Sequence, residues 1–265
     1  MDENTYSRTI SVPGADEEQA ARISVKTGID SSFFPSSGLS SEKLVQWTDR
    51  FLDTTAYSMD DMPGLLLEYL FDKIPATLWE AEVFRKSVSG ESISRRVVAR
   101  LHSVALALGS NTEKRENNLV QAVQELKKRK SFFCDLFSSL YESPPAGFLQ
   151  QPPFYNMALL GRTPLSPRAL LSYVKEIEED MGRGWSKRNR PRPIDIDIIY
   201  YDEEICEEKD LRIPHRERMK RDFVLLPLIE LLGEFRDPET GRRVRAGKGE
   251  GIHRLKSRGD IWKND

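Results

Sequence analysis

The chain has 265 residues, of which 38% are hydrophobic and 31% charged, and its formal net charge is −2. This is the composition of a globular protein of one or two domains, and no run approaches the ~20 apolar residues of a membrane span. The weak net charge argues against bulk nucleic-acid binding, and no secretory signal is visible. The two cysteines, Cys134 and Cys206, are expected as small buried thiols. We therefore expect a cytoplasmic protein without a membrane or nucleic-acid partner.

Acidic and basic side chains are unevenly distributed along the chain. Residues 1–98 contain 16 acidic and 10 basic side chains, whereas the remaining residues contain 26 and 30. A serine-rich loop or linker is expected over 87–94, and a new pattern follows it. We therefore predict a small α+β domain over 1–98, a larger domain over 99–245 and a polar, frayed tail over 246–265.

The N-terminal segment carries three local signals. Residues 31–41, SSFFPSSGLSS, predict a loop. Leucines and an isoleucine recur at helical spacing over 63–75, which predicts an amphipathic helix. The run LWEAEVFRK at 78–86 is typical of a strand. A small α+β extension that packs on the larger domain is the simplest interpretation.

The larger domain shows strands and helices in alternation. Hydrophobic periodicity predicts four strands, over 103–108, 132–141, 154–162 and 194–201. A helix capped by Asn111 or Thr112 is predicted over 113–128, between the first two strands, and a second from Ser166-Pro167 to Gly182, between the last two. The proline-rich residues 143–153 predict irregular structure. This β-α-β-β-α-β order favours a ferredoxin-like α+β sandwich.

Two aspartates lie on the last predicted strand, IDIDIIYY. Because strand side chains alternate between faces, Asp195 and Asp197 point to one face and the isoleucines between them point into a core. Neighbouring carboxylates repel each other unless a cation neutralises them, and hard oxygen ligands favour Mg²⁺. Five cations precede them in RGWSKRNRPR at 183–192, which is either a solvated loop or an anion site. The pattern favours Mg²⁺ and a polyphosphate held between carboxylates and guanidinium groups.

Aromatic and amide residues form a second group. Phe154 and Asn156 lie two apart on one predicted strand and share its face, and Phe223 follows downstream. Two rings could stack on a flat heterocycle while the amide binds its edge. Ordinary core packing of the two phenylalanines is the alternative.

These residues resemble the 6-hydroxymethyl-7,8-dihydropterin pyrophosphokinase family of folate synthesis, which has a ferredoxin-like fold. The resemblance runs from about Val104 to Leu231 and is carried by LALGSN at 106–111, ESPPAGFLQQPPFYNMAL at 142–159, EIEEDMGR at 176–183, RPIDIDIIYYDEEI at 192–205 and IPHRERMKRDFVLLPL at 213–228. Where the family usually has Trp-Gly-Pro-Arg before its acid pair, this chain has NRPR at 189–192.

The resemblance implies transfer of a pyrophosphoryl group from ATP to the hydroxymethyl oxygen of the pterin, with release of AMP and without a covalent nucleophile. It implies two Mg²⁺ ions on Asp195 and Asp197, with Arg183 and Arg192 beside the transferred group. ATP contacts are implied for Glu178, Arg183, Arg192, Ile198, His215 and Arg221. Pterin contacts are implied for Gly109, Asn111, Ser143, Pro144, Phe154, Asn156 and Phe223.

The N-terminal segment resembles a shortened dihydroneopterin aldolase, with a truncated T-fold. Within LLLEYLFDKI, Glu68 would anchor a pterin, and Lys86 would be the catalytic lysine at the end of the strand. This resemblance implies a second activity, cleavage of dihydroneopterin. The sequence predicts no oligomeric state.

Two other functions fit parts of the pattern. A nucleotidyltransferase or cyclase with a ferredoxin-like palm also uses strand aspartates for two metals, but it releases pyrophosphate and not AMP. An RNA-recognition module shares the element order and stacks bases on sheet aromatics. Without metal, the aspartate pair would repel an RNA backbone.

Overall fold

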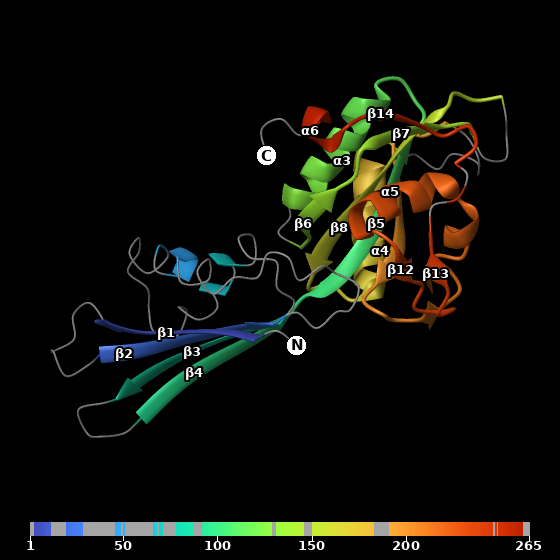
Figure 1. Ribbon diagram of the computed structural model, residues 1–265. Coiled ribbons are helices and arrows are strands. Elements are labelled where there is room, and N and C mark those ends of the chain that lie inside the picture. The colour runs from blue at the N-terminus through green and yellow to red at the C-terminus, as the bar shows by residue number, and fades with distance from the viewer. Residues whose placement is uncertain are drawn as a thin grey trace. The chain divides into compact units, whose positions relative to one another are not determined.

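The computed structural model of the chain describes residues 3–11, 20–28, 46–48, 50, 66–67, 69–70, 78–86, 92–128, 131–145, 150–182, 191–245, 247 and 249–261. The chain divides into two compact units, Met1–Leu101 and His102–Asp265 (Figure 1).

The N-terminal unit contains a four-stranded antiparallel sheet in which each strand pairs with the next along the chain. Its strands are β1 (Glu3–Ser11), β2 (Ala20–Gly28), β3 (Leu78–Lys86) and β4 (Ser92–Arg100). The predicted strand over 78–86 has the bounds of β3. The sequence analysis did not predict the other three strands, and β4 occupies the end of the segment expected as a linker.

Short helical pieces accompany this sheet at 46–48, 50, 66–67 and 69–70. Leu66, Leu67 and Leu70 are buried, as an amphipathic helix requires. The loop predicted over 31–41 and the rest of the helix predicted over 63–75 lie outside the described residues.

The C-terminal unit is built on a mostly antiparallel sheet in the order β14-β7-β8-β5-β9, with β6 also paired to β8. Its strands are β5 (His102–Ser110), β6 (Phe133–Phe137), β7 (Leu140–Ser143), β8 (Phe154–Thr163), β9 (Asp195–Tyr201) and β14 (His253–Lys256). The unit therefore has the α+β architecture expected from the sequence.

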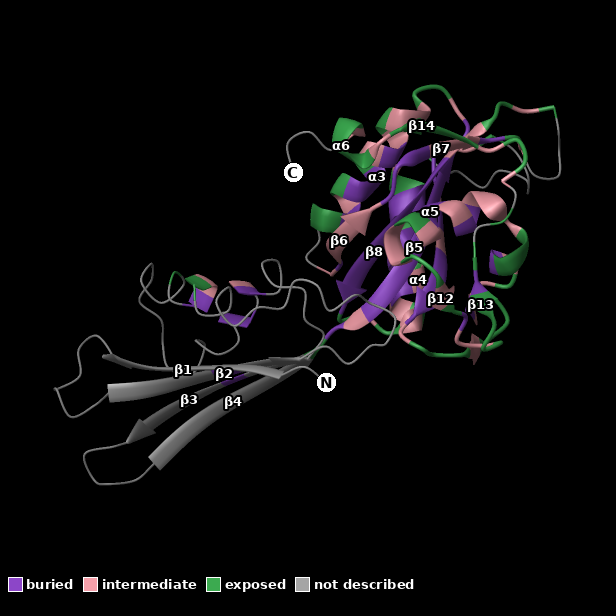
Figure 2. Cartoon of the chain, viewed as in Figure 1, coloured by how far each residue is buried: buried purple, intermediate pink, exposed green. Residues whose placement is uncertain are grey.

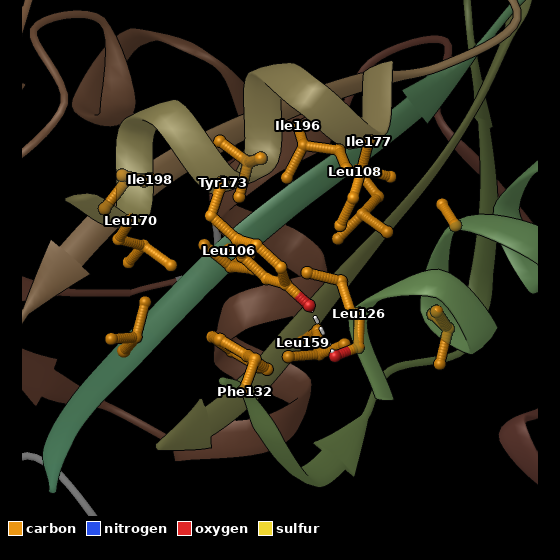
Figure 3. Close-up of a cluster of buried hydrophobic side chains, with 14 of the residues drawn as sticks. Leu106, Leu108, Leu126, Phe132, Leu159, Leu170, Tyr173, Ile177, Ile196 and Ile198 are labelled. Carbon is orange, nitrogen blue, oxygen red and sulfur yellow. Dashed lines mark hydrogen bonds between the residues drawn. The ribbon is translucent and has the colours of Figure 1, made fainter. Parts of the chain in front are cut away.

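Two helices, α3 (Arg115–Lys128) and α4 (Pro167–Asp180), cover one face of this sheet. Their apolar stripes and the alternate residues of the strands form the main core, which Figure 3 shows around Tyr173. Figure 2 shows the burial concentrated along β5 and β8. The Tyr173 hydroxyl reaches across this core to donate a hydrogen bond to the Leu126 carbonyl at 2.8 Å. We call this side of the sheet the helix face.

The boundaries of α4 follow its sequence signals. The Ser166 hydroxyl accepts a hydrogen bond from the Ala169 backbone at 3.4 Å, and Pro167 occupies the first helical turn. After Asp180 the helix ends, and Gly182 follows with a φ of +89°, which glycine adopts without a steric penalty. The predicted helix from Ser166 to Gly182 is confirmed.

Two local predictions in this unit were wrong. Helix α3 begins at Arg115, after a turn, so Asn111 and Thr112 do not cap it. The single strand expected over 132–141 is two strands, β6 and β7, which Ser138 and Ser139 separate. The Ser138 hydroxyl accepts from the Ala158 backbone and so takes the place of a regular ladder hydrogen bond.

The opposite face of the sheet, which we call the site face, carries α5 (Asp222–Leu232). Side chains that pair across antiparallel strands share a face. On β5 and β9, Asp197 pairs with Ala107, but Tyr200 pairs with Ala105 because the register shifts between these pairs. This β-bulge brings Tyr200 to the site face, where regular alternation would have placed Tyr201.

The remaining elements are short: β10 (Cys206–Glu207), β11 (Arg212–Ile213), the 3₁₀ helix η1 (Arg218–Lys220), β12 (Phe235–Arg236), β13 (Arg243–Val244) and α6 (Arg258–Ile261). The frayed tail expected over 246–265 is corrected by β14, which pairs with β7, and by Lys256, whose amine contacts both oxygens of Glu116 at 2.7 Å. The two free cysteines are partly exposed, not buried as expected. Among the described residues, no helix combines the length and apolar character needed to cross a membrane.

Candidate functional site

The aspartate pair lies on the site face at the start of β9. Asp195 pairs with Gly109 and Asp197 with Ala107, and the isoleucine between the two aspartates is buried on the helix face. The Asp195 and Asp197 side chains are 23% and 29% exposed. The alternation expected from the sequence therefore places both carboxylates at the surface of a cavity.

A first cavity opens beside this pair, over small residues of β5 and below the start of α5. It is lined by Ala107, Leu108, Gly109, Ser143, Pro144, Gln151, Phe154, Asn156, Arg192, Asp195, Asp197, Arg221, Phe223 and Val224. A Cβ added to Gly109 would lie 3.4 Å from Asn156 Oδ1 and 3.7 Å from the Phe154 ring. A side chain at this position would therefore fill the space beside Asn156 and Phe154, which the glycine leaves open.

A second cavity lies on the other side of Asp197. It is lined by Leu171, Lys175, Ile196, Asp197, Ile198, Glu207, Glu208, Lys209, Asp210, Leu211, Arg212, His215 and Arg216. The first cavity combines aromatic and amide side chains with two arginines and the aspartate pair, whereas most side chains that line the second are charged. Asp197 is the described residue that the two sets of lining residues share, so both cavities border on it.

Three cationic or titratable groups face the aspartates. The Arg192 guanidinium lies 3.2 Å from an Asp195 oxygen, and Arg221 Nη1 and His215 Nε2 lie 3.8 and 3.9 Å from Asp197 Oδ2. Burial and then the charge of Asp195 raise the pKa of Asp197. Burial lowers the pKa of His215, against the attraction of Asp197. The ionised form of the Asp197 carboxyl is therefore disfavoured in the site, and a bound cation would stabilise it.

Glu178 is buried beneath the aspartate strand and does not face either described cavity. Its carboxylate accepts a hydrogen bond from the Ile196 backbone at 2.6 Å and pairs with Lys175 at 2.9 Å. Glu178 therefore holds the backbone between the two aspartates in place.

Asn111 is also buried, and it connects two segments around the first cavity. Its Oδ1 accepts from the Arg192 backbone at 2.9 Å, and its Nδ2 donates to Gln151 Oε1 at 3.0 Å. Asn111 is not among the described lining residues of either cavity, and its contact with a pterin stays a prediction. The residue positions Arg192 and Gln151, which do line the first cavity.

The predicted aromatic and amide group is brought together in the first cavity. Phe154, Asn156 and Phe223 all line it. The Asn156 amide donates to the Ser143 hydroxyl at 2.9 Å, which fixes its orientation and leaves Oδ1 near Gly109. Pro144 completes this end of the cavity.

Some predicted residues lie outside what the structure describes. Arg183 and Glu68 are not described, and of Lys86 only its place as the last residue of β3 is given. Conversely, sequence reasoning missed Gln151 and Lys175 as lining residues. Gln151 stood within a run that carried the family resemblance, which was the available signal for it.

The donor set at the aspartates fits a hard divalent cation. Both carboxylates are partly exposed to the cavities, and among the described residues no group of three or more His, Cys, Asp or Glu side chains surrounds a metal position. Mg²⁺ keeps several waters and often takes only one or two carboxylates together with substrate phosphates. Arg192 Nε is buried without a hydrogen-bond partner in the described part of the chain, so a ligand oxygen would complete its bonding.

The comparisons with known proteins agree with this geometry. Residues 105–233 match the family model of 7,8-dihydro-6-hydroxymethylpterin-pyrophosphokinase. The chain is 38% identical over 205 residues to the folic acid synthesis protein of Dictyostelium discoideum, which covers 76% of this chain and 31% of that protein. It is 42% identical over 154 residues to a mitochondrial folate synthesis bifunctional protein of Arabidopsis thaliana, covering 58% and 28%. The chain thus spans about a third or less of these two relatives.

A shorter relative is covered more completely. The 2-amino-4-hydroxy-6-hydroxymethyldihydropteridine pyrophosphokinase of Bacillus subtilis is 40% identical over 135 residues, which cover 51% of this chain and 81% of that protein. The family-model match over 105–233 contains both aspartates, most of β5, the strands β6 to β9 and the whole of α5. The chain therefore belongs to the 7,8-dihydro-6-hydroxymethylpterin-pyrophosphokinase family.

Proposed function

We propose that the chain transfers a pyrophosphoryl group from ATP to the hydroxymethyl oxygen of 6-hydroxymethyl-7,8-dihydropterin and releases AMP. The observation that carries this proposal is that Asp197 lines two unlike cavities. A pterin suits the aromatic and amide side chains of the first cavity, and a nucleotide with its phosphates suits the charged second cavity. The bond to be formed would then lie beside Asp197, which borders both cavities.

The reaction is a displacement at the β-phosphorus of ATP. The pterin oxygen forms the new P–O bond, the bond between the α- and β-phosphoryl groups breaks, and the hydroxyl proton passes to solvent. Phe154 and Phe223 would hold the pterin ring, and Asn156 Oδ1 would accept from its edge. Positioning and charge neutralisation are sufficient for this chemistry, because phosphoryl transfer needs no covalent nucleophile.

The cations around the aspartates have separable roles in this proposal. Arg192 and Arg221 would bind phosphate oxygens, with Arg183 as a further candidate from the segment outside the described residues. His215 and Ile198 line the nucleotide cavity. Asp195 and Asp197 would hold two Mg²⁺ ions, which when bound supply charge neutralisation to the phosphates.

The proposal includes the finer architecture. The strand order β9-β5-β8-β7, with α3 and α4 as its two helical connections, supports a ferredoxin-like sandwich. We propose that the pyrophosphokinase domain covers residues 99–245, as predicted from the sequence. The segment 246–265 would pack on this domain through β14.

Product analysis with the full chain tests the proposed reaction. The protein is incubated with ATP, Mg²⁺ and the hydroxymethyldihydropterin, and AMP, pyrophosphate and the pterin diphosphate are quantified. We expect equal amounts of AMP and pterin diphosphate, no AMP without the pterin, and loss of both products in EDTA. Release of pyrophosphate in place of AMP would identify the nucleotidyltransferase alternative and contradict the proposal. Glu234→Gln, which removes one partner of an exposed ion pair with Arg243, is the control variant.

A second activity in the N-terminal unit stays a prediction. The aldolase resemblance and its truncated T-fold concern residues 1–98, where the described strands form an antiparallel sheet and Lys86 ends β3. The assay is cleavage of dihydroneopterin to glycolaldehyde by the wild type and by Lys86→Ala. Cleavage that Lys86→Ala abolishes supports the activity, and absence of cleavage by the wild type contradicts it.

A further inference from the structure

A buried ion pair close to the second cavity has no role in the site described so far. The carboxylate of Asp237 is fully buried and accepts hydrogen bonds from Arg218 Nε at 2.6 Å and Nη2 at 2.7 Å. The Tyr200 hydroxyl donates to it at 2.9 Å, and the backbone and hydroxyl of Thr240 donate at 2.9 and 2.8 Å. Burial of two charges is unfavourable unless such geometry compensates for it. The pair therefore ties together three segments of the chain, those of Tyr200, Arg218 and Asp237.

Arg218 lies in the turn between two residues that face Asp197. His215 precedes η1, and Arg221 follows it as the last residue before α5. The Arg218 backbone N–H and its Nη1 both donate to the His215 carbonyl at 3.1 Å. One side chain thus fixes the turn whose two ends carry His215 and Arg221.

The other end of the network is anchored to the aspartate strand. Tyr200 lies three residues after Asp197 on β9, and the β-bulge turns it toward the site face. The His215 backbone also donates to the Ile199 carbonyl at 2.9 Å. The turn is therefore held at two points to the strand that carries Asp197, once through its backbone and once through the Arg218–Asp237 pair.

We propose that Arg218 and Asp237 are positioning residues, which set the placement of His215 and Arg221 toward the nucleotide phosphates. This inference rests on the proposed function, because it assigns the phosphates to the space beside Asp197 that His215 and Arg221 both face. The described hydrogen bonds of Arg218 and Asp237 reach neither Asp195 nor Asp197, and the lining residue nearest to them in the chain is Arg221 in the same turn. Loss of the pair should therefore weaken nucleotide binding selectively.

The chain offers a matched control in a second buried arginine–aspartate pair. Arg162 on β8 donates to Asp135 on β6 from Nε at 2.8 Å and from Nη2 at 2.7 Å, and the Arg162 side chain is 4% exposed, as that of Arg218 is. Arg162 lies six residues along β8 from Asn156, about 20 Å at the rise of a strand. Its loss should reduce stability without changing the site.

The test compares Asp237→Asn with Asp135→Asn in the full chain. Calorimetry gives the Kd for a non-hydrolysable ATP analogue with Mg²⁺ and, separately, for the pterin, while thermal unfolding gives Tm. We expect Asp237→Asn to raise the Kd for the ATP analogue about tenfold and to leave the pterin Kd within about twofold. Both variants should lower Tm by similar amounts, because each breaks a buried arginine–aspartate pair. Asp135→Asn should change neither Kd. Steady-state kinetics should show the same selectivity as a higher KM for ATP.

The outcomes separate this inference from the proposed function. If both variants bind the ATP analogue as the wild type does, the pair is only structural and the inference is overturned. If the wild type binds neither ligand, the proposed function fails and the inference fails with it. Tyr200→Phe, which removes a single donor to Asp237, is the variant to use if Asp237→Asn does not fold. It should raise the Kd for the ATP analogue about threefold, and an unchanged value would count against the inference.

Discussion

The two faces of the C-terminal sheet differ in what the same strands present. On the helix face, β5 and β9 contribute leucines and isoleucines to a continuous apolar core. On the site face, the alternate residues beside the first cavity are alanine, glycine and aspartate, which leave room for the cavity and supply charge. The difference shows that a strand can stabilise the fold with one half of its side chains and form a site with the other half. Four predictions test how far the two faces are independent.

The largest effect is expected at the site face from Asp197→Asn. The amide keeps the shape of the side chain but removes the charge of the residue that lines both cavities. AMP formation should fall about 10³-fold, the order of effect known for loss of a single electrostatic contact to a transition state. Stability should not fall, because the repulsion from Asp195 is removed. The measurements are AMP production and urea unfolding, and near-wild-type AMP formation would falsify the assignment.

The complementary change on the helix face is Leu106→Ala. Leu106 is fully buried in the core, so its truncation should lower the free energy of unfolding by about 3 kcal/mol through lost burial and a residual cavity. The folded fraction should keep the substrate Kd values of the wild type. Denaturant unfolding and calorimetry check this. A changed pterin Kd with unaltered stability would show that the faces are coupled.

Phe223→Ala tests the aromatic side of the first cavity. Loss of one stacking ring should raise the pterin Kd by about tenfold or more, since aromatic stacking on a base contributes about 1–3 kcal/mol. The Kd for an ATP analogue should change far less. Titration of each ligand alone decides the matter, and a larger loss for the ATP analogue would reverse the assignment of the two cavities.

The smallest expected effect is a pH dependence from Asp237. Burial alone would raise the pKa of this carboxyl, but hydrogen bonds from Arg218, Thr240 and Tyr200 outweigh it and lower the pKa to about 2. A lowered folded-state pKa stabilises the protein above the unfolded value of 3.8, and this contribution is lost as the pH falls toward 2. It amounts to about 2 kcal/mol between roughly pH 5 and pH 2. Unfolding of Asp237→Asn across this range should lack that component, and an identical pH slope would rule it out.

Much of the site could be predicted because local rules determine it. Strand alternation alone places Asp195 and Asp197 opposite the core, and the Ser166-Pro167 signal places the start of α4. The family resemblance adds the residues of the first cavity, which come from separate strands and from α5. A single strand pattern contains no information about which other strands lie beside it.

The features that were missed depend on tertiary contacts. The β-bulge that turns Tyr200 to the site face has no signature in IDIDIIYY. Asn111 has the sequence of a helix cap, but its amide is used by Arg192 and Gln151. The pairing of Arg218 with Asp237 joins residues 19 apart in two separate turns, so no spacing rule indicates it.

The strand β14 has a consequence for the solubility of the protein. It covers the outer edge of β7, and the Gly249 backbone donates to Asp222 at the start of α5. Without the residues after 245, β7 would present unpaired backbone groups next to the first cavity. An uncovered strand of this kind is a template for association between copies of a chain. A shortened protein would therefore be expected to aggregate even though every residue assigned to catalysis is present.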